Sequence, residues 1–204
     1  TGYGDSPYQS FSTYAGNPYF IDLNELYEKG WLSKDLLPVY ETNTLEINYT
    51  HVYNTRYKLL KSAYFNSDIK ENKDYIQWCN EESWWLDDYA LFMAVKKRFN
   101  GDSWDKWAED IRKRWGFALD YYRRECYFDI EFYKYLQFTF REQWDKLKAY
   151  ANANGIEIVG DIPIYVAFDS ADAWTNPELF QFDDTCTPTG VAGCPPDAFS
   201  ATGQ

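Results

Sequence analysis

The stretch that decides the fold is residues 129–166, which read DIEFYKYLQFTFREQWDKLKAYANANGIEIVGDIPIYV. Apolar residues advance by threes and fours over its first part, which predicts a helix over 129–154 with one core-facing stripe. Gly155 stands where a C-cap glycine is expected. The β-branched run at 156–166 follows at once and predicts a buried parallel strand, so the stretch indicates one helix–strand unit of an α/β fold. The stripe consists of Phe132, Leu136, Phe140, Trp144, Leu147 and Ala151.

Outward from this stretch, helical patterns dominate the chain. Turn-forming residues fill 1–20 and 183–204, and residues 35–54 are irregular. One convincing strand is too few for a complete α/β domain, which indicates that the middle of the chain is a helical insertion. We expect most of the aromatic rings at core positions of that insertion. The predicted helices, with their caps included, lie at 22–28, 56–65, 89–99, 102–114 and 169–174.

Composition narrows the class of protein. The chain has 204 residues and a formal net charge of −12. Surfaces that bind nucleic acid or anionic membranes are rich in Lys and Arg, so this charge argues against both kinds of partner. Aromatic residues make up 21%, which excludes a disordered chain. No run of about 18 apolar residues is present, so no transmembrane helix is predicted. The N-terminus has neither the basic region nor the apolar core of a signal peptide. The chain begins with Thr1 and lacks an initiator Met, so we expect it to be cut from a longer protein.

The cysteines and the histidine predict no metal site. Cys79, Cys126, Cys186 and Cys194 form no CxxC pair, and His51 is the only histidine. A disulfide between Cys186 and Cys194 is an open alternative, but reduced cysteines in a cytosolic protein are the favoured interpretation. We therefore expect a cytoplasmic protein without a metal or other cofactor.

Two stretches have a composition suited to ligand binding. Asp161 lies near the C-terminal end of the predicted strand, where ligands bind in parallel α/β folds, although capping a turn is an equal alternative. In residues 195–204, a stiff Pro-Pro pair precedes Phe199. This favours a loop that folds over a substrate, with an ordinary surface turn as the alternative.

Two further stretches favour structural roles. Residues 4–10 combine short polar side chains with Tyr8, for which a rigid turn with a packed ring is the simpler interpretation. Further along the chain, helix capping by Asp169 or Ser170 is favoured over a catalytic role for Asp172.

Distinctive strings run along most of the chain. They are TGYGDSPYQSFSTYAGNPYFIDL (1–23), DDYALFMAVKKRF (87–99), LQFTFREQWDKLKAYANANGI (136–156), VGDIPIYVAFDSADAW (159–174), NPELF (176–180) and VAGCPPDAFSATGQ (191–204). In this order they resemble the 4-α-glucanotransferases (amylomaltases or disproportionating enzymes) of glycoside hydrolase family 77, which are relatives of the α-amylase superfamily. The resemblance is weakest from about residue 38 to 85.

The resemblance implies a (β/α)8 barrel with inserted helical subdomains. We therefore predict an α/β protein that forms a partial (β/α)8 TIM barrel with a large helical insertion. Residues 1–37 are expected to form the first part of the barrel with an active-site loop, 38–128 the mainly helical insertion, and 129–204 a barrel helix, a strand and an acceptor-side loop. A complete barrel typically needs about 250 residues, so this one is expected to be incomplete.

The resemblance also implies an activity, the transfer of segments of α-1,4-glucan to an acceptor glucan or glucose with retention at the anomeric carbon. Such chemistry uses two carboxyl groups, one forming a glycosyl-enzyme intermediate and the other acting as acid and then base. Maltooligosaccharides and α-1,4-glucans are the implied partners. A noncatalytic glucan-binding module and a hydrolase of the α-amylase superfamily are the alternatives.

Matching positions in these strings imply roles for individual residues. Tyr8 and Ser6 are expected to line the active-site cleft. Asp161 is expected to support the site without being the nucleophile, and Tyr3 to belong to a second glucan-binding groove.

A second group of implied contacts lies near Gln204. Asp197, Phe199 and Gln204 fall in a flexible loop over the acceptor side, where Gln204 is expected to contact bound sugar. Ala198 stands where many members have Tyr, so one sugar-facing ring is lost. The nucleophile, the acid/base Glu and the transition-state-stabilising Asp are expected after Gln204, and no catalytic residue is predicted in this chain.

Overall fold

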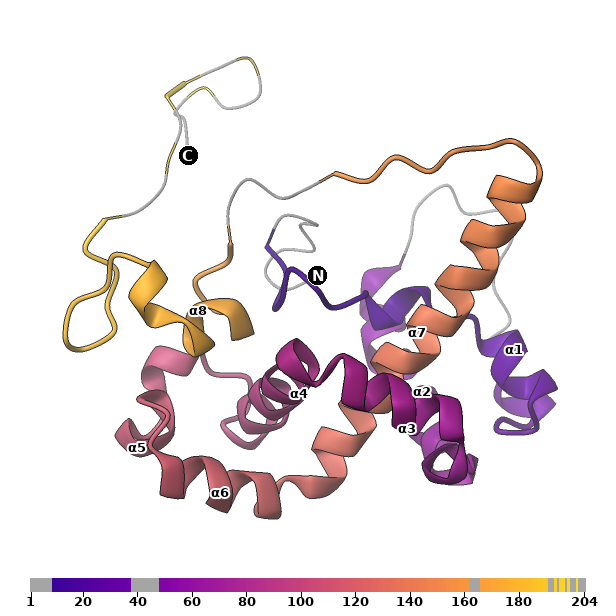
Figure 1. Ribbon diagram of the computed structural model, residues 1–204, viewed down its shortest axis with the longest axis horizontal. Coiled ribbons are helices and arrows are strands. Elements are labelled where there is room, and N and C mark those ends of the chain that lie inside the picture. The colour runs from indigo at the N-terminus through magenta and orange to yellow at the C-terminus, as the bar shows by residue number, and fades with distance from the viewer. Residues whose placement is uncertain are drawn as a thin grey trace. The chain divides into compact units, whose positions relative to one another are not determined.

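The computed structural model describes residues 9–37, 48–161, 166–190, 193, 195–196, 198 and 201 (Figure 1). Within these residues the chain is mostly helical and contains no strand, and Phe182 and Pro188 form an isolated antiparallel bridge. The α-helices are α1 (Leu23–Glu28), α2 (Tyr49–Asn66), α3 (Lys73–Glu81), α4 (Ser83–Arg98), α5 (Glu109–Arg112), α6 (Gly116–Glu125), α7 (Tyr127–Ala153) and α8 (Ala171–Thr175). The short 3-10 helices are η2 (Pro18–Phe20), η3 (Lys34–Leu36), η4 (Ile69–Glu71), η5 (Trp104–Lys106) and η6 (Pro177–Leu179).

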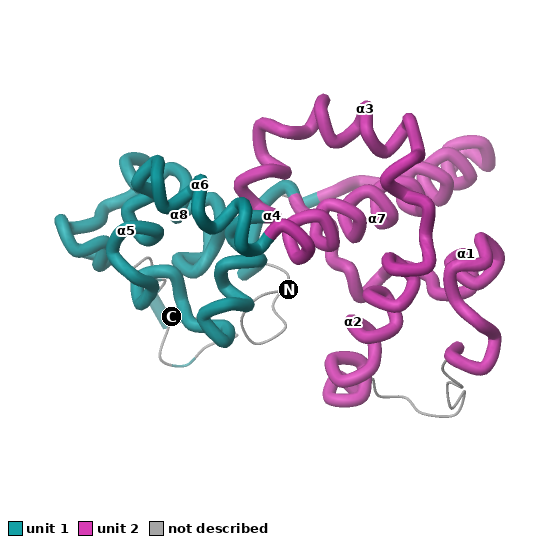
Figure 2. The backbone as a smooth tube through the Cα atoms, turned by 90° about the horizontal axis from the view of Figure 1, so that it is seen from below, with its two compact units in different colours: residues 1–14, 91–126, 161–204 teal, residues 15–90, 127–160 magenta. Residues whose placement is uncertain are grey.

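The chain divides into two compact units (Figure 2). Unit 1 consists of residues 1–14, 91–126 and 161–204, and unit 2 consists of residues 15–90 and 127–160. Helix α4 contributes residues to both units. The predicted division of the sequence at residues 37 and 128 stays a prediction.

Aromatic rings pack around the first half of α7 in unit 2. Tyr135 of α7 has no exposed surface, and Phe132 is 4% exposed. The ring centroid of Tyr64, from α2, lies 5.2 Å from that of Tyr135 and 5.7 Å from that of Phe132. Tyr75 of α3 meets Phe138 edge-on, with centroids 5.3 Å apart. Large buried rings of this kind supply much of the hydrophobic stabilisation of a core.

Tryptophans form the centre of unit 1. Trp104, Trp107 and Trp174 are at most 2% exposed, and Trp107 meets Trp174 edge-on with centroids 5.6 Å apart. A buried indole needs a partner for its N–H group. Each of these three indoles donates to a backbone carbonyl at 2.7 to 3.1 Å, which fixes the orientation of the rings.

Local capping signals place several helix ends where the sequence predicts them. Asp22 and Ser170 cap α1 and α8 by accepting hydrogen bonds from backbone N–H groups in the first turn. Gly101 follows α4 and Gly155 follows α7, with φ of +86° and +74°, values that favour glycine. The helices predicted at 22–28, 89–99, 129–154 and 169–174 are thereby confirmed.

Two predictions about the helical middle are wrong. Residues 49–54 are not irregular but form the first turns of α2, because the Asn48 side chain accepts a hydrogen bond from His51 N at 3.0 Å and caps the helix. The predicted helix at 102–114 is broken into η5 and α5, since Trp107 is extended with ψ of 166°. This break lets the indoles of both Trp104 and Trp107 reach the core.

The strand predicted at 156–166 is not seen in the part that the structure describes. Residues 156–161 are irregular and 162–165 lie outside the described residues. Val159 is 89% exposed and Ile156 is 58% exposed, so the expected burial is wrong for both. A parallel strand depends on hydrogen bonds to neighbouring strands and on helices that cover its faces, and the described residues supply neither here.

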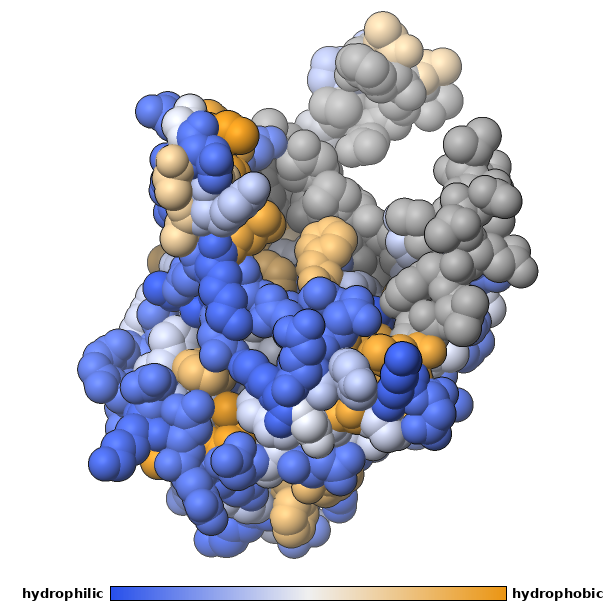
Figure 3. Space-filling view, turned by 90° about the vertical axis from the view of Figure 1, so that its right-hand side faces the viewer, coloured by the Kyte–Doolittle hydropathy of each residue, from blue (hydrophilic) through white to orange (hydrophobic). Residues whose placement is uncertain are grey.

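The predicted core stripe of α7 is buried only in part: Phe132, Leu136 and Ala151 are buried, whereas Trp144 is exposed. Leu136 has no exposed surface, whereas Leu147 is 55% exposed. Many aromatic rings are exposed as well, so the expectation that they lie in the core holds for only some of them. On the face drawn in Figure 3, the described residues are mostly hydrophilic and the hydrophobic ones lie in small separate groups.

None of the helices in the described ranges combines the length and the apolar character needed to cross a membrane. Prominent exposed rings are Phe65, Trp84, Phe117, Phe128 and Tyr150.

Candidate functional site

Most of the predicted site residues lie outside the residues that the structure describes. Asp161 is described, belongs to unit 1, is exposed and directly precedes residues 162–165. Ala198 is also described and exposed. Whether the predicted residues come together as one glucan site therefore stays a prediction. The predicted residues outside the described ranges are Tyr3, Ser6, Tyr8, Asp197, Phe199 and Gln204.

The segment that follows Tyr8 is held by its own serines. Ser10 Oγ donates to Ser12 O at 2.7 Å, and Ser12 Oγ accepts from Tyr14 N at 3.1 Å. Ser12 is 4% exposed. Hydrogen bonds of this type from short polar side chains to nearby backbone replace regular secondary structure. The backbone of residues 10–14 is thus fixed locally.

The same segment is bound to α8. Ala171 N donates to Phe11 O at 2.8 Å. Thr13 donates twice to Asp172, from N to Oδ2 at 2.9 Å and from Oγ1 to Oδ1 at 3.2 Å. Both carboxylate oxygens of Asp172 therefore join two parts of unit 1, which supports a structural role for this residue.

Asp169 and Ser170, the two candidates for capping α8, have different roles. Ser170 is the cap, and its Oγ accepts from Ala173 N at 3.2 Å. Asp169 Oδ2 accepts from Lys96 Nζ at 2.5 Å, and Oδ1 accepts from Trp104 N at 3.4 Å. The capping prediction is confirmed for Ser170. Asp169 instead forms an ion pair with Lys96 of α4, which lies 73 positions away in the sequence.

Lys96 is the cation at the centre of this arrangement. It is 8% exposed, and its Nζ also donates to Asp102 O at 3.2 Å. The same Nζ lies 5.2 Å from the ring centroid of Phe11 and 6.0 Å from that of Phe92, within the range of cation–π attraction. A buried ammonium is tolerated only when it is paired and hydrogen-bonded. The sequence alone does not reveal this role, because no local signal links Lys96 to Asp169.

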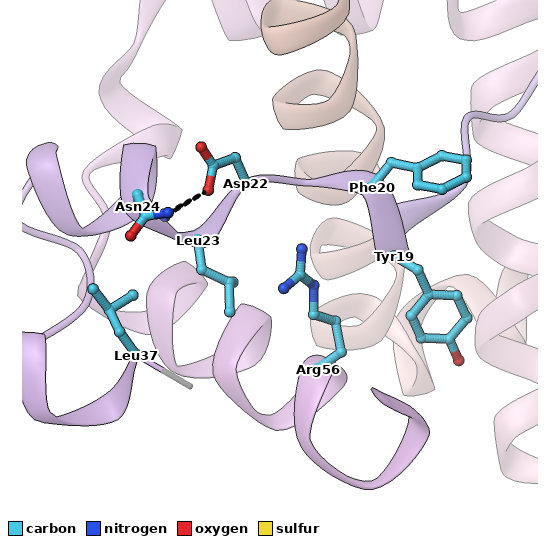
Figure 4. Close-up of a pocket in the computed structure, with 7 residues that line it drawn as sticks. All are labelled: Tyr19, Phe20, Asp22, Leu23, Asn24, Leu37 and Arg56. Atoms are coloured by element: carbon cyan, nitrogen blue, oxygen red, sulfur yellow. Dashed lines mark hydrogen bonds between the residues drawn. The ribbon is translucent and has the colours of Figure 1, made fainter. Parts of the chain in front are cut away.

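A pocket of about 410 Å³ lies within unit 2 (Figure 4). Arg56 points from α2 toward the segment between Tyr19 and Leu23, and its guanidinium donates to Ile21 O. Asp22 Oδ1 accepts from Asn24 Nδ2 at 3.0 Å. These polar groups bind one another and the backbone, so the pocket displays no catalytic arrangement. The lining residues are Tyr19, Phe20, Asp22, Leu23, Asn24, Leu37 and Arg56, none of which the sequence analysis predicts as a site residue.

In the part of the chain that the structure describes, no group of three or more His, Cys, Asp or Glu side chains could hold a metal ion. Cys79, Cys126 and Cys186 are not in disulfides, and Cys194 lies outside the described residues. Burial raises the pKa of the Cys79 thiol to about 11, so this thiol is protonated at neutral pH.

Comparison with known proteins assigns the chain to a family. The family model described as 4-alpha-glucanotransferase, that of glycoside hydrolase family 77, matches residues 1–204, and the chain belongs to this family. The 4-alpha-glucanotransferase of Clostridium butyricum is 48% identical over 207 residues, which cover 100% of this chain and 42% of the relative. That of Thermus thermophilus is 44% identical over 208 residues, which cover 100% of this chain and 41% of the relative.

A solved structure gives the same assignment. The amylomaltase from Streptococcus agalactiae in complex with acarbose matches with a TM-score of 0.88 and 37% identity. The match covers 100% of this chain and 42% of that chain. The described helices therefore correspond to part of an amylomaltase, and the chain spans about two fifths of the length of the relatives it matches.

Proposed function

We propose that this chain is the N-terminal part of a retaining 4-α-glucanotransferase, which transfers segments of α-1,4-glucan to an acceptor glucan or to glucose. The observation that carries the proposal is the match of the family model over residues 1–204. The acarbose bound to the similar amylomaltase supports maltooligosaccharides and α-1,4-glucans as ligands of this chain.

In the complete protein, this chain contributes part of a (β/α)8 barrel of the α/β class. Residues 38–128 form a helical insertion between 1–37 and 129–204, and residues 156–166 form a barrel strand. The β-branched run at 156–166 supports this arrangement, because residues of this type favour a strand that other strands and helices bury.

The proposed glucan contacts follow the family motifs. Asp161 supports the site, while Tyr3 belongs to a second groove. The catalytic carboxyl groups belong to sequence beyond Gln204, where one forms the glycosyl-enzyme intermediate and the other moves the proton. Transfer requires that an acceptor sugar outcompete water at this intermediate, which a covering loop favours by excluding water. The residues proposed to contact glucan directly are Ser6, Tyr8, Asp197, Phe199 and Gln204.

The test is product analysis with maltotriose. A longer protein that contains this chain is expected to release glucose and longer maltodextrins, and the 204-residue chain alone is expected to release none. A longer protein without products contradicts the proposed function. Turnover by the 204-residue chain contradicts the placement of the catalytic carboxyl groups.

The alternatives have their own tests. Small glucan-binding modules are usually compact β-sandwiches. The long helices α2, α4 and α7 argue against such a module in this chain. A far-UV circular dichroism spectrum dominated by β-sheet would favour such a module. Incorporation of labelled glucose into maltodextrins separates a transferase from a hydrolase.

A cytoplasmic location stays a prediction, which cell fractionation tests.

A further inference from the structure

Helix α6 of unit 1 exposes aromatic rings where a surface helix normally carries polar side chains. Phe117 is 65% exposed, and Trp115 and Tyr121 are each 44% exposed. Ala118 and Tyr122 are buried and hold α6 on the core of unit 1. We name the three exposed rings, those of Trp115, Phe117 and Tyr121, the α6 platform.

The rings of the α6 platform form one aromatic surface. The ring centroids of Trp115 and Phe117 lie 5.7 Å apart, and the two ring planes are inclined at 53°. Phe117 and Tyr121 are four positions apart in α6, so their side chains lie on the same face of the helix. Single exposed rings are common on protein surfaces, whereas a group of neighbouring exposed rings indicates a binding surface.

The backbone beneath the α6 platform is fixed within unit 1. Trp115 N donates to Asp110 O at 2.9 Å, and Trp115 O accepts from Ala118 N at 2.9 Å. The guanidinium carbon of Arg114, the residue before Trp115, lies 4.3 Å from the ring centroid of the buried Trp174. Rigid aromatic groups on an ordered backbone lose little conformational entropy when a ligand binds to them.

The charges on α6 balance, which argues for an uncharged ligand. The helix carries two acidic and two basic side chains, namely Asp120, Glu125, Arg123 and Arg124. Asp120 and Arg123 form an exposed ion pair with an N–O distance of 3.5 Å, and such a pair contributes little to stability. These polar groups are therefore available for hydrogen bonds to a ligand. A nucleic acid or an acidic lipid would instead need a basic surface, and the net charge of the chain is −12.

A glucan matches this combination of rings and polar groups. The C–H groups on one face of a glucose unit pack on the electron-rich face of an aromatic ring, while the hydroxyl groups at its edge bind polar side chains. The inclined planes of Trp115 and Phe117 suit a curved chain, whose successive sugar faces are turned relative to one another. An α-1,4-glucan is curved in this way, whereas a β-1,4-glucan is a flat ribbon that needs coplanar rings.

We propose that the α6 platform is a surface site that binds long α-1,4-glucan chains. This inference rests on the proposed function, because the glucan class of the ligand follows from it. The three platform residues are not among those proposed to contact glucan directly. In Figure 1, α6 lies on the side of unit 1 opposite α8, from which the described chain continues toward residue 190. Binding a polymer at a second point raises its local concentration, so long glucans gain affinity and short sugars do not.

The test uses a longer protein that contains this chain and measures its retardation in native gels that contain amylose. Phe117→Ala and Trp115→Ala are each expected to weaken amylose binding about tenfold, the scale of one lost apolar contact. Phe117→Tyr keeps a ring and is expected to bind as the unmutated protein does. The matched control is Phe128→Ala, which removes a ring that is 68% exposed on α7 and lies outside the platform. The same variants are expected to raise KM for amylose and to leave KM for maltotriose unchanged.

Other occupants of the α6 platform give different results. Unchanged amylose binding in both alanine variants overturns the proposal, as does an equal loss in Phe128→Ala. If another part of the longer protein or a second copy covers the rings, Phe117→Ala lowers the melting temperature well below that of Phe128→Ala or changes the oligomeric state, and either result overturns the proposal.

A neutral β-1,4-glucan, hydroxyethylcellulose, is the ligand control for the native gels. The alanine variants are expected to migrate in hydroxyethylcellulose as the unmutated protein does, and a loss of retardation equal to that in amylose overturns the α-1,4 preference. An unmutated protein that binds amylose through the platform but transfers no glucan contradicts the proposed function instead, so the two failures are distinguishable.

Discussion

The side-chain amide of Gln137 forms hydrogen bonds with both the N–H and the C=O group of Gly16, an arrangement that we call the bracket. Gln137 Oε1 accepts from Gly16 N at 2.8 Å, and Nε2 donates to Gly16 O at 3.0 Å. Gln137 lies in α7 and is 2% exposed, so in unit 2 a helix side chain satisfies loop backbone as a neighbouring strand would. A Cβ on Gly16 would lie 2.1 Å from Phe140 Cδ1, so the close approach of the ring requires glycine here.

We expect Gly16→Ala to lower the free energy of unfolding by about 1–3 kcal/mol, because the added methyl group overlaps the Phe140 ring. Urea unfolding followed by far-UV circular dichroism measures the change. Gly116→Ala is the matched control, since a Cβ there meets nothing within 4 Å. Equal stability of the two variants would contradict the close approach at Gly16.

Gln137→Leu is expected to cost about 1–3 kcal/mol, because it leaves the N–H and C=O groups of Gly16 without their side-chain partner. The same urea experiment measures this cost. Gln77→Leu, at an exposed position of α3, is the control and is expected to stay within about 0.5 kcal/mol of the unmutated protein. A Gln137→Leu variant as stable as this control would show that the bracket contributes nothing.

Alkaline pH is expected to unfold unit 2 through its buried tyrosines. Burial raises the pKa of Tyr75, Tyr89 and Tyr133 well above the usual value of about 10. The unfolded chain therefore releases these protons first, so the stability they contribute is full below pH about 10 and is lost as pH rises beyond it. Absorbance at the tyrosinate band and circular dichroism, recorded together, are expected to show a fraction of tyrosines that ionise only as helix is lost.

Tyr133→Phe serves as the control for this titration. It removes one late-titrating group and is expected to move the alkaline transition to higher pH. Reversible ionisation of all tyrosines near pH 10 in the folded protein would refute the prediction.

In a longer protein that contains this chain, we expect Phe199→Ala to lower transfer to a glucan acceptor by about tenfold, the scale of one lost apolar contact in a substrate pocket. Hydrolysis is expected to fall less, because water needs no ring to bind. Product ratios with labelled glucose acceptor give the measurement. Phe128→Ala, at a position that is 68% exposed on α7, is the control. Equal loss of transfer and hydrolysis would count against an acceptor role for Phe199.

Helix positions could be predicted because their signals are local. Asp22, Ser170 and Gly155 act on backbone groups within the adjacent turn, so the ends of α1, α8 and α7 follow from neighbouring residues. The break at Trp107 could not be predicted in this way, because it depends on where two indoles find a core. Of the predicted site residues only Asp161 is described, so the glucan site stays a hypothesis taken from the family motifs.

By itself, the sequence determined most of the helical segments and, through strings that keep their order along the chain, the family. Only the tertiary structure revealed what Asp172, Lys96 and Gln137 do, because their partners lie 159, 73 and 121 positions away. No pattern of neighbouring residues encodes contacts at such separations. The run at 156–166 illustrates the same limit: its β-branched residues favour a strand, but a strand forms only where another segment offers backbone hydrogen bonds.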